Sequence, residues 1–122
     1  MSGELAKVPF LDVGASYGEI DDEINEAVQR VLKSGRYVLG PEVEAFEQEY
    51  AAFVGARECV SVANGLDALT LALLALDVGP DDEVIVPANT YIATWLAVTR
   101  TRASIVPVEP DEATYNITAD AV

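Results

Sequence analysis

Residues 59–76, CVSVANGLDALTLALLAL, decide the fold of this chain because they predict a strand, a tight turn and a helix in succession. A short buried strand is suited by Cys59, Val60, Val62 and Ala63, and Asn64 and Gly65 interrupt it. Residues 68–76 follow as helix formers without a break. Such a turn leaves unpaired backbone N–H groups at the helix N-terminus, where an anion such as phosphate is favoured. A purely structural turn has the same pattern, so this stretch alone leaves both interpretations open.

Two helices are expected before this stretch. Residues 19–34 place apolar side chains at helical spacing, with acids in the first turns and bases in the last, and Gly35 is the expected end. Pro41 opens the second helix, at a position where its missing N–H is harmless, and Gly55 ends it. The expected buried stripe of this helix consists of Val43, Phe46, Tyr50, Phe53 and Val54. The acidic faces of both helices are interpreted as solvated surfaces.

Two further strands are expected after it, at residues 83–87 and 104–108, with a helix through Thr99 between them. The order βαβαβ predicts parallel strands joined by right-handed crossovers, and such sheets bind ligands at the carboxyl ends of their strands. The turns at Asn64 and Asn89 should therefore share one edge. We expect an α/β fold with a parallel βαβαβ core preceded by two helices.

The expected organisation is an N-terminal arm over residues 1–18 and a partial domain over residues 19–122. Thr118 suits the N-cap of a helix that begins close to the last residue. Three strands of a parallel sheet leave edges and apolar helix faces uncovered. We therefore expect the chain to be part of a larger protein and to self-associate when isolated.

Composition excludes several classes of function. The net charge of −14, from 21 acidic and 7 basic residues, would repel nucleic acid and anionic membrane surfaces, so neither is expected as a partner. The chain has no histidine and one cysteine, Cys59, which excludes imidazole-based metal sites, histidine-based triads and internal disulfides; no metal is expected. The first residues lack the pattern of a signal peptide and no apolar run could span a bilayer, so a cytoplasmic location is expected.

Four stretches, in register over about residues 8 to 122, make the sequence recognisable. They are SGRYVLGPEVEAFEQEYAAFVG at 34–55, NGLDAL at 64–69, GPDDEVIVPANTYIATWLAV at 79–98 and VPVEPDEATYNI at 106–117. Together they resemble the pyridoxal-phosphate-dependent sugar aminotransferases of the DegT/DnrJ/EryC1/StrS family. The resemblance implies the N-terminal part of the large domain of a fold-type-I transferase. It also implies a homodimer with shared active sites, and amination of a nucleotide-linked keto-sugar, closest to a dTDP-linked 3-keto-6-deoxyhexose, with glutamate as amino donor.

The resemblance also implies residues that bind the cofactor, pyridoxal 5'-phosphate. Backbone amides after the Asn-Gly turn hold its phosphate, which carries over to Gly65, Leu66 and Asp67, and an aromatic residue stacks on its ring, which carries over to Tyr91. The negative charge of Asp67 is compatible with phosphate only if its carboxylate turns aside to cap the helix or to bond nearby backbone. Trp95 is an alternative ring partner, although packing is the more common role for such a residue.

Weaker candidates concern the substrate. Asn89 and Thr94 are candidates for lining the same pocket, by their position in the second turn. Arg36 and Tyr37 lie in a loop that in similar proteins approaches an active site, either that of its own subunit or that of the neighbouring one. Arg36 is a candidate for contacting substrate phosphate, and an exposed loop charge is an equally good interpretation.

The chain carries no candidate catalytic residue. Similar aminotransferases need a lysine that forms a Schiff base with the cofactor and an acid on the pyridine nitrogen. The family places both beyond residue 122, and we expect Lys7 and Lys33 to be non-catalytic. The chain alone is therefore expected not to transaminate. A non-catalytic binding or interaction module, or a truncated remnant of such an enzyme, remains the alternative.

Overall fold

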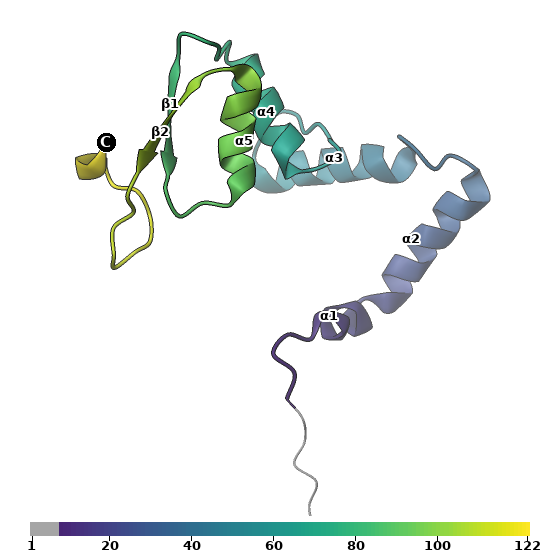
Figure 1. Cartoon of the computed structure of the whole chain (residues 1–122). Coiled ribbons are helices and arrows are strands. Elements are labelled where there is room, and N and C mark those ends of the chain that lie inside the picture. Colours follow the sequence, from purple (N-terminus) through teal and green to yellow (C-terminus); the bar gives the residue numbers. More distant parts are fainter. Residues whose placement is uncertain (1–7) are drawn as a thin grey trace, which may run out of the picture. The chain divides into compact units, whose positions relative to one another are not determined.

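The computed structural model describes residues 8–122 and divides the chain into two compact units, Met1–Val60 and Ser61–Val122 (Figure 1). Lys7 and the beginning of the expected N-terminal arm lie outside the described residues. Within residues 8–122, no helix combines the length and the apolarity that crossing a bilayer would require.

The described part of the first unit, residues 8–60, contains helices α1 (Val13–Glu19), α2 (Asp21–Ser34) and α3 (Pro41–Val54). The helix expected over residues 19–34 therefore begins slightly later, because Ile20 leaves the helical conformation with φ −135° and ψ 22°. The helix α1 was not predicted and forms within the region expected to be an arm. Asp12 explains its start, since its carboxylate accepts a backbone N–H from the first turn of α1.

Glycine ends both of the predicted helices. Gly35 follows α2 with φ 68° and Gly55 follows α3 with φ 70°, the left-handed conformation that residues with a side chain adopt only at a cost. Pro41 occupies the first turn of α3, as the sequence predicted. These boundaries are local events, which is why the sequence located them correctly.

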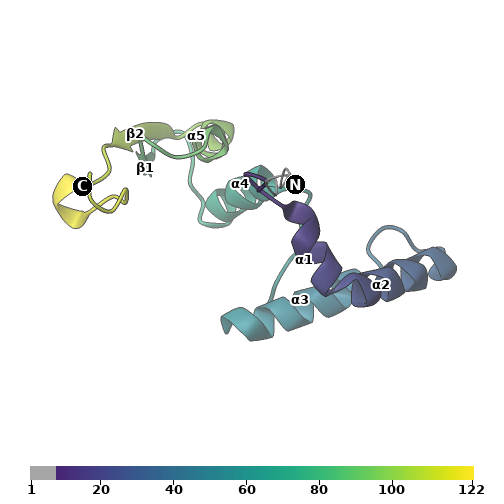
Figure 2. The same ribbon diagram turned by 90° about the horizontal axis from the view of Figure 1, so that it is seen from below.

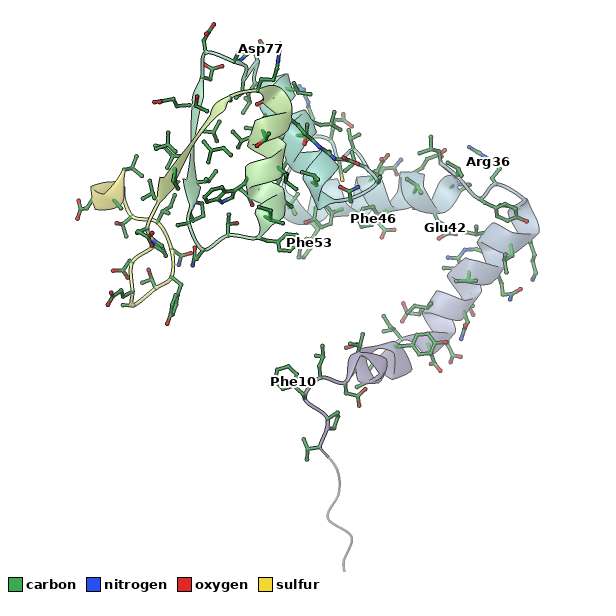
Figure 3. All side chains as sticks on the ribbon, viewed as in Figure 1. Phe10, Arg36, Glu42, Phe46, Phe53 and Asp77 are labelled. Carbon is green, nitrogen blue, oxygen red and sulfur yellow. The ribbon has the colours of Figure 1, made fainter. Side chains whose placement is uncertain are left out.

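Aromatic side chains line one face of α3, where the sequence predicted an apolar stripe. The rings of Phe46 and Tyr50 stack with centroids 5.5 Å apart, and the ring of Phe53 lies next to that of Tyr50. Phe46 and Phe53 are labelled in Figure 3. The stripe was expected to be buried, and this expectation was wrong for the structure described: Phe53 is 86% exposed. Helical periodicity identifies the apolar face, but only a neighbouring element can cover it.

The second unit contains a parallel α/β unit. Its elements are α4 (Gly65–Ala75), β1 (Glu83–Pro87), α5 (Ile92–Thr101), β2 (Ser104–Val108) and the short 3-10 helix η1 (Ala119–Ala121). The strands β1 and β2 pair in parallel, with Val84 opposite Ile105, and α5 is the crossover between them. The helix α5 lies against the two strands, and α4 packs along α5 (Figures 1 and 2).

A small apolar core holds this unit together. Val86 of β1, Val98 of α5 and Ala103 are buried, and Leu73 of α4 and Trp95 of α5 pack against them. The packing interpretation of Trp95 is thus supported by its contacts. The core includes Leu73 near the end of α4, so it holds this helix against α5 and the sheet.

The first predicted strand does not form. The α/β class and the parallel sheet are confirmed, but residues 59–63 belong to no strand, and the sheet of the described residues has only β1 and β2. A strand requires a neighbouring strand in a hydrogen-bonded ladder, and the only strand pair within residues 8–122 is that of β1 with β2. Val60 is accordingly 78% exposed, although the composition of the segment around it suits a buried strand. The predicted βαβαβ core is therefore observed as α4 followed by one βαβ unit.

Candidate functional site

An open groove of about 710 Å³ lies in the second unit, where the first turns of α4 and α5 meet. Its lining is mostly apolar and includes Asn64, Gly65, Leu66, Tyr91 and Thr94. The sequence predicted that the turn at Asn64 and the turn before α5 would share one edge of the fold. The structure brings Asn64 and Tyr91 to a single concave surface, but Asn89 is not part of its lining.

The N-terminus of α4 presents two backbone donors at this groove. Asn64 has extended backbone angles, φ −166° and ψ 171°, and its Oδ1 accepts the N–H of Asp67 at 2.9 Å. The N–H groups of Gly65 and Leu66 donate to no acceptor within residues 8–122. A Cβ placed on Gly65 would meet no heavy atom within 4 Å, so there is room beside this turn. Two free amides at an open helix N-terminus fit a phosphate group.

The carboxylate of Asp67 has two hydrogen-bond partners, which hold its negative charge in a fixed direction beside the expected phosphate site. Its Oδ2 accepts the side-chain amide N–H of Asn64 at 2.9 Å, and its Oδ1 accepts Nη1 of Arg100 at 2.8 Å. The carboxylate was expected to turn towards backbone groups, whereas both partners are side chains. Sequence reasoning missed Arg100, and no local signal could have found it, because it lies 33 residues away on the last turn of α5.

Tyr91 lies at the N-cap position of α5 and lines the groove with a side chain that is 79% exposed. An exposed ring beside the two free amides is suited to stacking on a flat ligand. The hydroxyl of Thr94 lies 2.9 Å from that of Thr90, which fixes its direction in the first turn. Asn89 does not line the groove; its side-chain amide donates to the carbonyl of Tyr115 at 3.3 Å and ties down the loop after β2.

Arg36 and Tyr37 belong to the first unit, in the loop between α2 and α3 (Figure 3). Nη2 of Arg36 donates to the carbonyl of Leu39 at 2.9 Å and lies 3.8 Å from Oε1 of Glu44. The hydroxyl of Tyr37 lies 3.5 Å from the carbonyl of Leu32. Both side chains line a cavity of about 260 Å³ within this unit. Their contacts here are structural, and a role towards a substrate stays a prediction.

The same cavity contains the ion pair of Arg30 and Glu42, whose Nε and Oε1 atoms are 2.7 Å apart. The hydrogen bond from Arg30, with its positive charge, lowers the pKa of Glu42, and the bond to Glu42 raises the pKa of Arg30. Both groups are exposed, so the pair mainly orients the loop between α2 and α3. Within residues 8–122, no group of three or more acidic or cysteine side chains is placed to hold a metal ion.

Solved structures of aminotransferases share this fold. The chain superposes on the crystal structure of Streptomyces venezuelae DesV in complex with a ketimine intermediate with a TM-score of 0.81 and 57% identity, over 87% of this chain and 29% of that one. An aminotransferase from Brucella abortus gives a TM-score of 0.87 and 36% identity, over 93% of this chain and 31% of that one. The parallel α/β unit therefore has the fold of an N-terminal segment of the fold-type-I aminotransferases.

The chain belongs to the DegT/DnrJ/EryC1/StrS aminotransferase family, whose sequence profile matches residues 18–122. It is 57% identical over 109 residues to dTDP-3-amino-3,4,6-trideoxy-alpha-D-glucose transaminase of Streptomyces venezuelae, covering 89% of this chain and 29% of that protein. It is 54% identical over 110 residues to dTDP-3-amino-3,6-dideoxy-alpha-D-galactopyranose transaminase of Aneurinibacillus thermoaerophilus, covering 90% of this chain and 30% of that protein. The chain thus spans about 30% of the length of the curated relatives it matches.

Proposed function

We propose that this chain supplies the phosphate-binding part of the cofactor site of an aminotransferase that aminates a nucleotide-linked keto-sugar. A dTDP-linked 3-keto-6-deoxyhexose is the proposed substrate and glutamate the proposed amino donor. The observation that carries the proposal is the pair of free amides, Gly65 and Leu66, which share a groove with the exposed ring of Tyr91. The two similar transaminases described above are both named for dTDP-linked 3-amino sugars, which supports the substrate class.

The residues have separate roles in this proposal. Gly65 and Leu66 donate their N–H groups to the cofactor phosphate, and the positive end of α4 favours its charge. The backbone N–H of Asp67 already donates to Oδ1 of Asn64, so it can contact the phosphate only as a shared hydrogen bond. Tyr91 supports the flat ring, and its aromatic face orients the ligand at little entropic cost. When bound, pyridoxal phosphate supplies the electron sink through which an amino group can be transferred.

The proposal places the catalytic lysine outside this chain. Lys33 lies on the last turn of α2, and the sequence resemblance places the Schiff-base lysine beyond residue 122. We propose that the chain binds phosphate without transaminating by itself. In the complete enzyme we propose a homodimer whose subunits share active sites, which is the arrangement that the sequence resemblance implies.

Gly65 offers a sharp test because one substitution removes its N–H alone. Proline is well tolerated at the first position of a helix, and the extended backbone of Asn64 suits a residue before proline. Gly65→Pro should weaken the binding of pyridoxal phosphate by about 1.5–3 kcal/mol, or roughly ten- to a hundredfold in Kd, because one charge-assisted hydrogen bond is lost. Gly65→Ala keeps the N–H and has open space for its Cβ, so it is the matched control.

Binding is measured by titrating the full chain with pyridoxal phosphate while following its backbone amides by NMR, with inorganic phosphate as competitor. We expect the signals of Gly65 and Leu66 to shift in the unmodified chain and in Gly65→Ala. Equal affinities for the proline and alanine variants would contradict the proposed contact. If inorganic phosphate does not compete with pyridoxal phosphate, or if pyridoxal phosphate does not bind, the result would favour the alternative of a non-catalytic module or a truncated remnant of such an enzyme.

A further inference from the structure

The carboxylate of Asp67 lies in the first turn of α4, directly after the two free amides. A negative charge there stabilises the helix through its dipole, but it also competes with any phosphate bound at the same N-terminus. The two partners of this carboxylate use both of its oxygens: Asn64 contacts Oδ2 and Arg100 contacts Oδ1. The charge is therefore both neutralised and fixed in direction.

We propose that Arg100 is a positioning residue for the cofactor phosphate. It holds the Asp67 carboxylate, so that Asp67 keeps Asn64 in its capping conformation and does not repel an anion at Gly65 and Leu66. This inference rests on the proposed function, because it assigns a role to Arg100 only if a phosphate group binds at this turn.

The ion pair contributes little to the stability of the fold as a whole. The side chains of Arg100 and Asp67 are 49% and 36% exposed, and exposed pairs of this kind have small effects on folding. Its position gives it a local effect instead. Removal of the guanidinium leaves a carboxylate without its cation beside the proposed phosphate donors, where repulsion between like charges lowers the affinity for an anion.

The pair also connects the two sides of the groove. Arg100 lies on the last turn of α5, whereas Tyr91 lies at the N-cap of the same helix, so one rigid element carries both. Asp67 and Asn64 lie at the start of α4 beside the free amides. The contact between Arg100 and Asp67 therefore helps to fix the distance from the phosphate donors to the ring partner, in addition to its effect on charge.

A charge-removal cycle in the full chain tests this role. Arg100→Gln should raise the Kd for pyridoxal phosphate roughly three- to tenfold, because the Asp67 charge is no longer neutralised. The double variant Arg100→Gln with Asp67→Asn should recover most of this loss, since the repelling carboxylate is also gone. Arg102→Gln is the matched control: it removes the same charge from an exposed residue two positions further along.

The readouts separate an electrostatic role from a structural one. Pyridoxal without its phosphate should bind the Arg100→Gln variant as well as it binds the unmodified chain, while pyridoxal phosphate should bind more weakly. A double variant as weak as Arg100→Gln alone, or an Arg100→Gln variant equal to the Arg102→Gln control, would overturn the inference. If Arg100→Gln fails to fold by circular dichroism, Asp67→Asn decides: it should bind pyridoxal phosphate at least as tightly as the unmodified chain, and weaker binding refutes the inference.

The proposed function and this inference fail in different ways. If the unmodified chain shows no phosphate-dependent binding at Gly65 and Leu66, the proposed function is wrong and the role of Arg100 goes with it. If the unmodified chain binds and Gly65→Pro weakens binding, but Arg100→Gln does not, only the inference about Arg100 is wrong.

Discussion

Replacing Asn64 by alanine should loosen the first turn of α4, because Asn64 is the cap of that helix. Its Oδ1 accepts the N–H of Asp67 at 2.9 Å, and its side-chain amide donates to the Asp67 carboxylate at 2.9 Å. Loss of such a cap costs about 1 kcal/mol, within a range of about 0.5–2. The second hydrogen bond is exposed and adds a few tenths at most, since Arg100 still holds the carboxylate.

Amide hydrogen exchange measures this loss where it occurs. A cost of about 1–1.5 kcal/mol corresponds to a roughly five- to tenfold faster exchange of the amides in the first turns of α4, if that helix opens from its N-terminus. Asn64→Ser is the matched control, because serine keeps an oxygen that can accept the Asp67 N–H. The strands β1 and β2 should exchange almost as before.

Two results would refute the reasoning about the cap. Equal acceleration in the alanine and serine variants would show that the side-chain acceptor is not what holds the turn. Unchanged exchange in Asn64→Ala would show that the contacts of α4 with α5, rather than its cap, determine how easily its first turn opens.

Three further predictions concern packing, backbone conformation and pH. Val98→Ala removes two methyl groups from a residue that is 1% exposed, and should lower the free energy of unfolding by about 2–3 kcal/mol in urea titrations; Val60→Ala, at a position 78% exposed, should change it by less than about 0.5. Gly55→Ala should destabilise α3 by about 1 kcal/mol because φ is 70° there, whereas Gly18→Ala inside α1 should stabilise by about 0.5–1, which circular dichroism melts can compare. The hydroxyl of Thr114, and after it backbone N–H groups, lower the pKa of Asp111. The stability that these hydrogen bonds give the turn is therefore fully present above the ordinary aspartate pKa and is lost as the pH falls through the lowered pKa of Asp111. In Thr114→Val, an NMR titration should find the Asp111 pKa closer to its ordinary value, and an unchanged pKa would contradict the role given to Thr114.

Local features of the sequence located most helix boundaries and both observed strands. Gly35, Gly55 and Pro41 act through their own backbone preferences, so the helix ends that they specify needed no knowledge of distant contacts. The resemblance to the aminotransferase family, carried by long stretches in register, was likewise available from the sequence and is confirmed by the family match over residues 18–122. The candidates Gly65, Leu66 and Tyr91 came from that resemblance, and their roles stay predictions.

The sequence by itself therefore determined the α/β class, the turn at Asn64 and the family, because these depend on residue preferences and on patterns along the chain. Only the tertiary structure decided that Arg100 contacts Asp67, and that residues 59–63 do not join the sheet formed within residues 8–122. Both outcomes depend on which segments come together in space. An ion pair between residues 33 positions apart and a ladder between two strands each require a second segment, and the local sequence does not specify which segment that is.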